Sequence, residues 1–378
     1  MKRIVIAPDS FKESLSSPEA AARIAEGVRK VLPNTEIIEI PLSDGGEGLT
    51  KTIAAACGGR FISADVTGPL GTPVPAFFAI LEDGETAVME MASASGLMLV
   101  QRALRNPLLT TTFGTGELIV KALDAHCRTL IVGIGGSATN DGGAGMAQAL
   151  GYKLLNSEGE SIGFGASELL NLNSIDASEV DPRLKESVVV VACDVNNPLC
   201  GPKGAAYVYA PQKGAAPDML PLLDQALEHL ATVIERDLGL SVKDLPGSGA
   251  GGGLGAGLMA FAGGHLQKGI DLVLKTVNFE DKLKGADLVI TGEGEINAQS
   301  LHGKVPIGVA QISKKLGIPV LAIVGSIGPG AEHCYQAGID GIMTLAPGPI
   351  TLEESIARTG ELLTDATERA LRLILMRQ

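Results

Sequence analysis

Short aliphatic runs alternate with segments of helical hydrophobic spacing near the start of the chain. The apolar, β-branched runs at 3–7 and 36–40 predict two strands. Between them, a segment that opens at Ser17-Pro18 and ends near Leu32 predicts a helix, because proline is favoured at the first helical position. So short a connection between two strands predicts a right-handed parallel crossover.

The last third of the chain repeats this pattern, whereas the middle departs from it. In the last third, strands are predicted at 287–291, 320–325 and 341–345, and helices at 305–316 and 352–376. A further helix is predicted near the start of the chain, at 45–57. In the middle, runs separated by proline and glycine turns predict mixed or antiparallel sheet at 65–66, 74–81 and 86–91, and apolar strands at 129–133 and 188–193. The glycine-rich segment 246–257 is predicted to lie outside any helix interior.

These patterns together predict an α/β fold of two domains. Residues 1–64 and 285–378 are expected to form a discontinuous, doubly wound Rossmann/flavodoxin-like parallel sheet, and residues 65–284 an inserted mixed α/β domain. A length of 378 residues agrees with two domains. A single larger domain is the alternative.

Composition narrows the classes of partner. Thirty Lys and Arg residues stand against 43 Asp and Glu, so the formal net charge is −13, which argues against nucleic acid as a partner. No apolar stretch is long enough for a transmembrane helix, and the apolar run before Pro8 is too short for a signal peptide. The five cysteines include no CxxC pair, so we expect a reduced, cytoplasmic protein with no membrane partner.

Polar residues follow the first two predicted strands. Asp9, Ser10 and Lys12 come directly after the first strand, where ligands of doubly wound sheets bind. After the second strand, Asp44 is followed by Gly45 and Gly46, which allow a ligand to approach the backbone closely. Solvated turns and helix caps are the alternative interpretations of both motifs.

A third motif, GIGGSATNDGG at 133–143, joins an apolar strand to a helix predicted at 144–150. Its glycines and polar side chains resemble a phosphate-binding loop in general terms, with candidate contacts at Gly135, Gly136, Ser137, Asn140 and Gly142. The spacing Gly133-x-Gly135-x-x-Ala138, with Glu158 further on, also fits a dinucleotide fingerprint, so a nicotinamide-dependent oxidoreductase is an alternative. A merely tight turn is the other.

Carboxylates follow two later strands. Asp194 stands in the loop after the strand at 188–193, where it is either a base, a Mg²⁺ ligand or a turn former. The loop TGEGEINAQSLHGK at 291–304 brings Glu293, Glu295 and Lys304 together in sequence. Carboxylates beside a lysine suit the handling of a metal-bound phosphate.

These motifs resemble those of the class-I glycerate kinase family. The resemblance covers nearly the whole chain, in order, through APDSFKESLS, SDGGEG, VTGPLG, EMASASGL, FGTGELI, GIGGSATNDGGAGMAQALG, GAAYVYAPQKGA, GAGGGLGAG and TGEG…QSLHGKVPIGVA. It implies an ATP- and Mg²⁺-dependent kinase of D-glycerate, with two α/β domains and an active site in the cleft between them. It further implies phosphorylation of the 2-hydroxyl, giving 2-phosphoglycerate, with the 3-hydroxyl as the alternative.

Roles follow from the motifs and this resemblance together. Ser10, Lys12, Gly45 and Gly46 are expected to bind the substrate, and Gly135, Gly136, Ser137, Asn140 and Gly142 the phosphates of ATP. Asp194 and Glu293 are the expected Mg²⁺ ligands. Asp44, Asp194 and Lys12 are the expected catalytic residues.

One loop departs from the family pattern. The family typically reads GEG-Arg-hydrophobic-Asp, whereas this chain has Glu295 and Asn297. Asn297 cannot accept a proton or bring negative charge to a metal. A weakly active or regulatory ligand-binding relative is therefore a further alternative, and a homodimer is compatible with the sequence.

Overall fold

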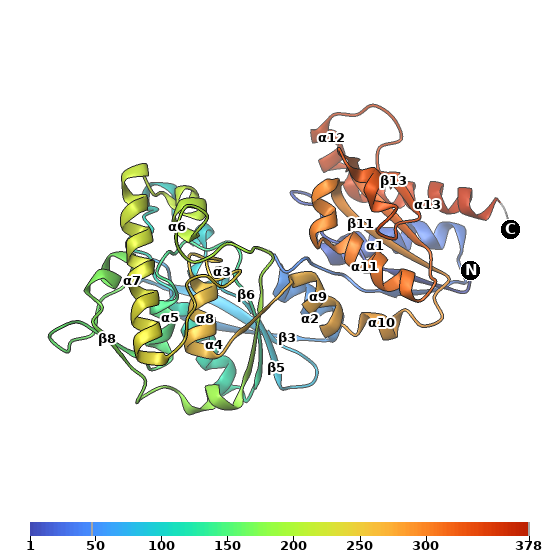
Figure 1. Ribbon diagram of the computed structural model, residues 1–378. Coiled ribbons are helices and arrows are strands. Elements are labelled where there is room, and N and C mark those ends of the chain that lie inside the picture. Colours follow the sequence, from blue (N-terminus) through green and yellow to red (C-terminus); the bar gives the residue numbers. More distant parts are fainter. Residues whose placement is uncertain (47, 377–378) are drawn as a thin grey trace. The chain divides into compact units, whose positions relative to one another are not determined.

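The chain forms two compact units, each built from more than one stretch of sequence. The computed structural model describes residues 1–46 and 48–376 (Figure 1). Unit 1 comprises residues 1–44, 51–57 and 268–376, and unit 2 comprises residues 45–46, 48–50 and 58–267. The predicted α/β class is confirmed, since both units contain a sheet with parallel strands and accompanying helices.

Unit 1 is built on a parallel sheet of five strands. Their order is β13-β12-β11-β1-β2, and every neighbouring pair is parallel. Counted along the chain within this unit, that is the order 2-1-3-4-5, which is flavodoxin-like. The bounds are β1 Arg3–Ile6, β2 Glu36–Glu39, β11 Leu288–Ile296, β12 Val320–Ile327 and β13 Gly341–Thr344.

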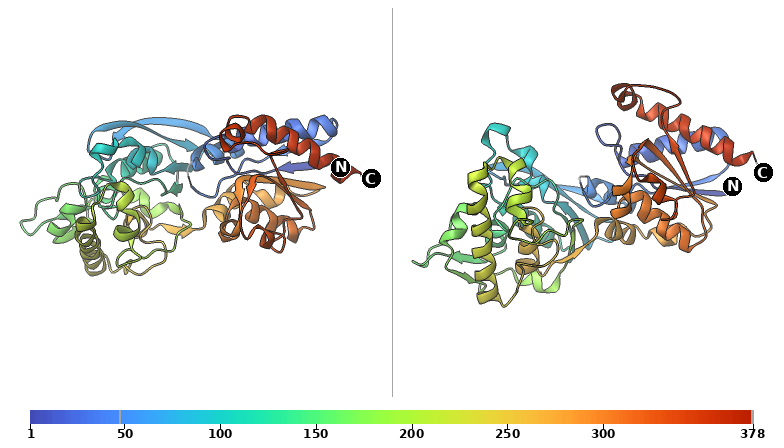
Figure 2. Two further views of the ribbon diagram at one scale, coloured as in Figure 1. Left: turned by 90° about the horizontal axis from the view of Figure 1, so that it is seen from above. Right: turned by 45° about the horizontal axis from the view of Figure 1, so that its top comes forward.

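Helices cover both faces of this sheet. The helix α1 (Ser17–Val31) begins at a capping box in which the backbone N–H of Ser16 donates to Glu19 Oε2 at 2.9 Å. It packs beside α13 (Thr359–Leu375) on one face, while α11 (Val305–Lys315) covers β11 and β12 on the other (Figure 2). The remaining helices are α2 Leu49–Cys57, whose residues 51–57 belong to this unit, α9 Gly269–Thr276, α10 Phe279–Lys282 and α12 Leu352–Ala357.

Unit 2 is built on a mixed sheet of six strands in the order β10-β9-β6-β5-β4-β3. The first four are mutually parallel, and β4 and β3 continue the sheet antiparallel, so the mixed sheet predicted for the middle of the chain is confirmed. The bounds are β3 Arg60–Thr67, β4 Pro73–Ile80, β5 Thr86–Glu90, β6 Thr129–Gly133, β9 Val188–Ala192 and β10 His265–Gln267. A separate hairpin pairs β7 Lys153–Leu155 with β8 Ser174–Asp176.

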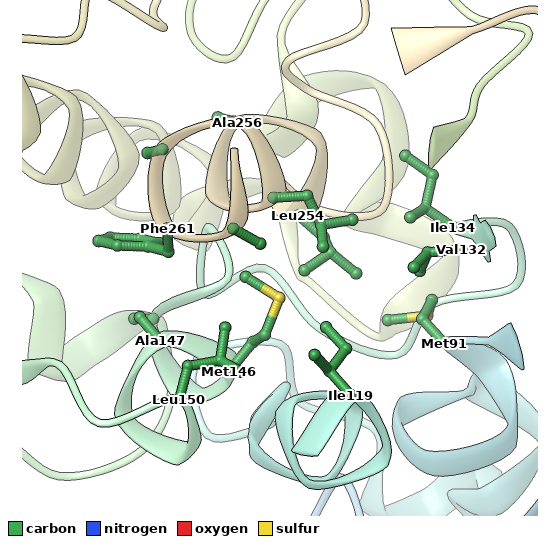
Figure 3. Close-up of a cluster of buried hydrophobic side chains, with 14 of the residues drawn as sticks. Met91, Ile119, Val132, Ile134, Met146, Ala147, Leu150, Leu254, Ala256 and Phe261 are labelled. Carbon is green, nitrogen blue, oxygen red and sulfur yellow. The ribbon is translucent and has the colours of Figure 1, made fainter. Parts of the chain in front are cut away.

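The core of unit 2 joins this sheet to several helices. Figure 3 shows Ile119, Val132, Met146 and Leu254 meeting from four different elements, and all four are fully buried. The helices are α3 Ala92–Ser95, α4 Phe113–Asp124, α5 Ala144–Ala149, α6 Ala205–Tyr209, α7 Leu220–Leu238 and α8 Leu254–Ala262. No helix in the described part of the chain is both long enough and apolar enough to span a membrane.

Two predicted helices have different bounds. The helix predicted at 45–57 begins only at Leu49, because Gly45 and Gly48 adopt positive φ angles of 94° and 86° that a helix does not allow. The helix predicted at 352–376 is divided into α12 and α13 at Arg358, whose φ of −110° lies outside the helical range.

The prediction that segment 246–257 lies outside any helix interior is wrong for its last four residues. The helix α8 begins at Leu254 and therefore includes Gly255 and Gly257. A Cβ on Gly257 would lie 2.5 Å from the carbonyl oxygen of Gly142. The glycine is thus required for close packing of α8 on the loop that precedes α5, which outweighs its low helix propensity.

Candidate active site

The candidate site of unit 1 lies at the carboxyl ends of β1 and β11. These neighbouring strands are the point where the strand order reverses, which is where doubly wound sheets bind ligands. The segment after β1 is held on β11, because the backbone N–H of Asp9 donates to the carbonyl of Gly292 at 2.8 Å and Thr291 Oγ1 donates to the carbonyl of Ala7 at 2.7 Å. The polar residues after β1 are therefore brought to Glu293.

A cavity of about 410 Å³ opens at this edge. Four of the predicted site residues line it, namely Ser10, Lys12, Asp44 and Glu293. Asp9 and Lys304 also line its polar side, and an apolar wall is formed by Leu345, Leu352 and Ile356. The cavity thus combines carboxylates, two lysines and an apolar surface within one unit.

Two carboxylates of this cavity, Asp9 and Glu293, have a raised pKa. The pKa of Asp9 is raised to about 7, first by burial and then by the negative charges of Asp44 and Glu293, although the backbone N–H of Ser10 opposes the shift. Burial likewise raises the pKa of Glu293. Ser300 Oγ, at 2.7 Å, and Lys304 Nζ, at 3.1 Å, counteract that shift by stabilising the Glu293 carboxylate.

This excess of negative charge is what a bound cation would offset. Carboxylate oxygens are the ligands that Mg²⁺ prefers, and it is usually held by one or two of them together with substrate phosphates. Within the described residues, no three His, Cys, Asp or Glu side chains form a closed metal cage. Of the two expected Mg²⁺ ligands, Glu293 lines this cavity, whereas Asp194 lines the cavity of unit 2 that is described below.

Glu295 and Asn297 stand on the same cavity and bind each other. Asn297 Nδ2 donates to Glu295 Oε1 at 2.6 Å, and Ser326 Oγ donates to Glu295 Oε2 at 3.2 Å. Asn297 Oδ1 accepts from the backbone N–H of Gln299 at 2.8 Å and so caps the short 3₁₀ helix at Ala298–His302. The two departures from the family pattern are thus joined by a hydrogen bond.

A second cavity, of about 240 Å³, lies within unit 2. The predicted residues that line it are Gly45, Gly46, Gly135, Gly136, Ser137 and Asp194. Gly136 has a positive φ of 71°, and a Cβ at Gly135 would meet no atom within 4 Å. Tyr209 and Gln212 also line this cavity. The loop after β6 therefore presents open backbone to this cavity, as phosphate binding needs.

The remaining residues of this loop lie deeper. Asn140 is fully buried, and neither polar atom of its side chain has a hydrogen-bond partner among the described residues. The backbone N–H of Gly142 donates to the carbonyl of Gly252 at 3.1 Å, and neither Gly142 nor Asn140 lines the cavity. Asp141 accepts from both the backbone N–H and Oγ1 of Thr112 at 2.8 Å.

The prediction from sequence missed Lys213, whose side chain binds the backbone of the same loop. Its side chain is buried, and Nζ donates to the carbonyl of Thr139 at 2.7 Å. Burial lowers the pKa of Lys213 to about 7, opposed by the charge of Asp141. No strand end points to Lys213, so the only signal was its place in the run GAAYVYAPQKGA.

Comparisons with known proteins show which family the chain resembles over nearly its whole length. The chain matches the model of the glycerate kinase family over residues 4–375. It is 53% identical to a glycerate kinase of Bacillus subtilis (strain 168), covering 95% of this chain and 94% of that one. It is 51% identical to a glycerate 2-kinase of Escherichia coli (strain K12), covering 93% of each.

A solved structure also matches the whole chain. It is a crystal structure from Salmonella typhimurium LT2 that was provisionally assigned as glycerate kinase 2, with 47% identity and a TM-score of 0.91 over 99% of this chain and 98% of that one. A family model that spans nearly the full length, relatives above half identity and a shared structure lead to one conclusion. The chain belongs to the glycerate kinase family.

Proposed function

We propose that this kinase transfers a phosphoryl group from ATP to the 2-hydroxyl of D-glycerate. Membership of the glycerate kinase family supports the substrate, and the name of the Escherichia coli relative, glycerate 2-kinase, supports the position. The observation that carries the proposal is the cavity of unit 1, where Ser10, Lys12 and Glu293 lie at the switch point of the sheet.

We assign substrate binding to residues in each unit. In unit 1, the Lys12 ammonium would bind the glycerate carboxylate and Ser10 Oγ would donate to a substrate oxygen. In unit 2, Gly45 and Gly46 line the second cavity and are the further residues that we assign to the substrate. Positioning and charge neutralisation dominate phosphoryl transfer, so such contacts account for much of the expected rate.

We assign the phosphates of ATP to the loop after β6. Gly135, Gly136 and Ser137 line the cavity of unit 2 and would donate to phosphate oxygens. Asn140 and Gly142, which do not line the cavity, would keep the loop in shape rather than touch the nucleotide. Mg²⁺, when bound, neutralises phosphate charge, and Glu293 of unit 1 and Asp194 of unit 2 are each a candidate carboxylate for it.

A carboxylate must orient the attacking hydroxyl and accept its proton. Asp44 and Asp194 are the two candidates from the strand ends. Asp9 is a third, because a pKa of about 7 matches a group that gains and loses a proton near neutral pH. Single replacement of each carboxylate by its amide separates the three.

Release of ADP, measured with and without D-glycerate in the presence of ATP and Mg²⁺, tests the activity. A release that depends on D-glycerate is expected. The phosphorus NMR spectrum of the product then identifies the position, and 3-phosphoglycerate as the product would overturn the proposed 2-hydroxyl specificity. No glycerate-dependent ADP release would instead favour the regulatory relative that Asn297 suggests.

A further inference from the structure

Glu295 is a charged residue of the unit 1 cavity to which the proposed function gives no role. It lies near the end of β11, where its neighbour in the parallel ladder is Ser326 of β12. A Cβ on Gly328 would come within 2.9 Å of Glu295 Oε1, so the turn after β12 packs tightly on this carboxylate. Although exposed to solvent, Glu295 is therefore held in place on three sides.

Asn297 fixes Glu295 in a way that no carboxylate could. Its Oδ1 accepts from the backbone N–H of Gln299 at 2.8 Å, which leaves Nδ2 to donate to Glu295 Oε1 at 2.6 Å. An Asp at 297 could replace the first contact but not the second, because an ionised carboxylate only accepts. It would also bring a second negative charge to within hydrogen-bond distance of Glu295.

The charges around the cavity determine what Glu295 does to a ligand. The side chains that line the cavity carry five carboxylates and two ammonium groups, namely Asp9, Glu13, Asp44, Glu293, Glu295, Lys12 and Lys304. Lys304 is already paired with Glu293 at 3.1 Å. A ligand with one negative charge can use Lys12, whereas a second negative charge near Glu295 would meet an uncompensated carboxylate.

We propose that Glu295, held by Asn297, is a specificity-determining residue that restricts this cavity to hydroxy acids with a single carboxylate. The inference rests on the proposed function in one respect, that D-glycerate binds in the cavity of unit 1. Glu295 keeps free lone pairs after accepting from Asn297 and Ser326, so it can accept from a ligand hydroxyl but repels a ligand carboxylate.

The test compares D-glycerate with hydroxymalonate, in which a second carboxylate replaces the CH₂OH group of glycerate. The KM for D-glycerate and the Ki of hydroxymalonate as a competitive inhibitor are measured for the wild type, Glu295→Gln, Asn297→Asp and the double variant. Glu295→Gln should lower the Ki by about tenfold or more while changing the KM much less. Asn297→Asp should raise both constants.

In the double variant, position 295 carries the amide and position 297 the carboxylate. The hydrogen-bond donor is then at 295 and the acceptor at 297. Its ratio of Ki to KM should return toward that of the wild type. Glu280→Gln and Asn34→Asp make the same chemical changes at exposed positions of unit 1 outside the cavity, and should leave both constants unchanged. Thermal unfolding of every variant separates loss of binding from loss of fold.

An unchanged ratio of Ki to KM in Glu295→Gln overturns the inference, and this variant suffices even if Asn297→Asp does not fold. A rise in activity of Asn297→Asp with Glu295 still present also overturns it. Failure of the proposed function is recognised separately, because the wild type itself would then show no turnover of D-glycerate. Binding of D-glycerate and hydroxymalonate, measured by calorimetry, would in that case decide the charge selectivity.

Discussion

At the scale of single residues, Asp9 is a cavity carboxylate whose surroundings bring its pKa near neutral pH. Its burial and the charges of Asp44 and Glu293 raise its pKa from 3.8 to about 7. The carboxylate is thus ionised only toward the alkaline side, where it can accept a proton from a substrate hydroxyl. The folded state correspondingly binds this proton more tightly than the unfolded chain does.

Replacing Asp9 by Asn should change both the rate and its pH dependence. We expect the wild-type kcat to fall as the pH is lowered through about 7, where Asp9 becomes protonated. In Asp9→Asn, kcat should be about 10²–10⁴-fold lower and should lack this dependence. Steady-state rates across the neutral pH range measure both effects, and an unaltered pH profile in the variant would exclude Asp9 as the base.

The same substitution should alter the pH dependence of stability in a defined direction. Between the unfolded pKa of 3.8 and the folded pKa of about 7, the native state holds a proton that the unfolded state has lost. The contribution of Asp9 to the free energy of unfolding is therefore present at low pH and is lost as the pH rises through this window. Urea unfolding at several pH values should show this loss in the wild type and not in Asp9→Asn.

Replacing Asp44 or Asp194 by Asn tests the other two candidate catalytic carboxylates. If either orients the attacking hydroxyl or holds Mg²⁺, its replacement by Asn should lower kcat by about 10²–10⁴-fold without unfolding the protein. Rates and circular dichroism of the two variants provide the measurement. Asp65→Asn, at an exposed position of β3, is the matched control. Normal turnover of a variant would remove that residue from the mechanism.

Much of the candidate site could be predicted from the polar residues that follow predicted strands in the sequence. It identified Ser10, Lys12 and Glu293, which line one cavity because the carboxyl ends of neighbouring parallel strands share one edge of the sheet. It did not predict the raised pKa of Asp9, since that property depends on burial and on charges far apart in sequence. Their roles remain predictions.

At the scale of elements, the loop between β6 and α5 is held by contacts with several other segments. Lys213 donates to the carbonyl of Thr139, and Asp141 ties the loop to Thr112 at the start of α4. A Cβ on Gly252 would lie 1.9 Å from the same Thr139 carbonyl oxygen. These contacts of Lys213, Thr112 and Gly252 therefore hold the backbone of the loop in place without a ligand.

Removing the Lys213 ammonium should weaken this support. In Lys213→Met, the buried Thr139 carbonyl loses its donor, and the free energy of unfolding should fall by about 1–3 kcal/mol. Hydrogen exchange should accelerate first at residues 137–143. Lys185→Met, at an exposed position of the same unit, serves as the control and should change neither measurement.

If Lys213→Met unfolds at the same denaturant concentration as the wild type, the hydrogen bond to Thr139 does not stabilise the loop. If exchange accelerates uniformly across the unit, the lysine contributes to general stability and not to the position of the loop.

The elements themselves were predicted best where local signals and packing agree. The strand β1 starts at the predicted residue. The helix α1 does so as well, because Ser16, Pro18 and Glu19 form a start signal that is independent of the rest of the fold. The start of α8 could not be predicted, since Gly255 and Gly257 are favourable there only through their close contacts with other segments. The helix α7, Leu220–Leu238, was not identified from the pattern at all.

At the scale of the whole molecule, each unit has a hydrophobic core of its own. Phe78 is fully buried in the core of unit 2, and Leu363 is fully buried in the core of unit 1. The two cores share no residue among those described. Loss of packing in one core should therefore be felt mainly within its own unit.

Large-to-small substitutions test this separation. Phe78→Ala should cost about 3–5 kcal/mol and Leu363→Ala about 2–5 kcal/mol of the free energy of unfolding of the affected unit. Native-state hydrogen exchange should accelerate in unit 2 for the first variant and in unit 1 for the second. Equal acceleration throughout the chain in either variant would show that the two units unfold as one.

The assembly of unit 1 from both ends of the chain has a consequence for biosynthesis. On the ribosome, β1 and β2 emerge first, yet β1 gains its second neighbour only when β11, about 280 residues later, has been made. The whole of unit 2 is translated in that interval and can bury its own core. A nascent chain thus carries an unpaired strand edge for most of its synthesis, and this edge is open to pairing with other chains until β11 is made.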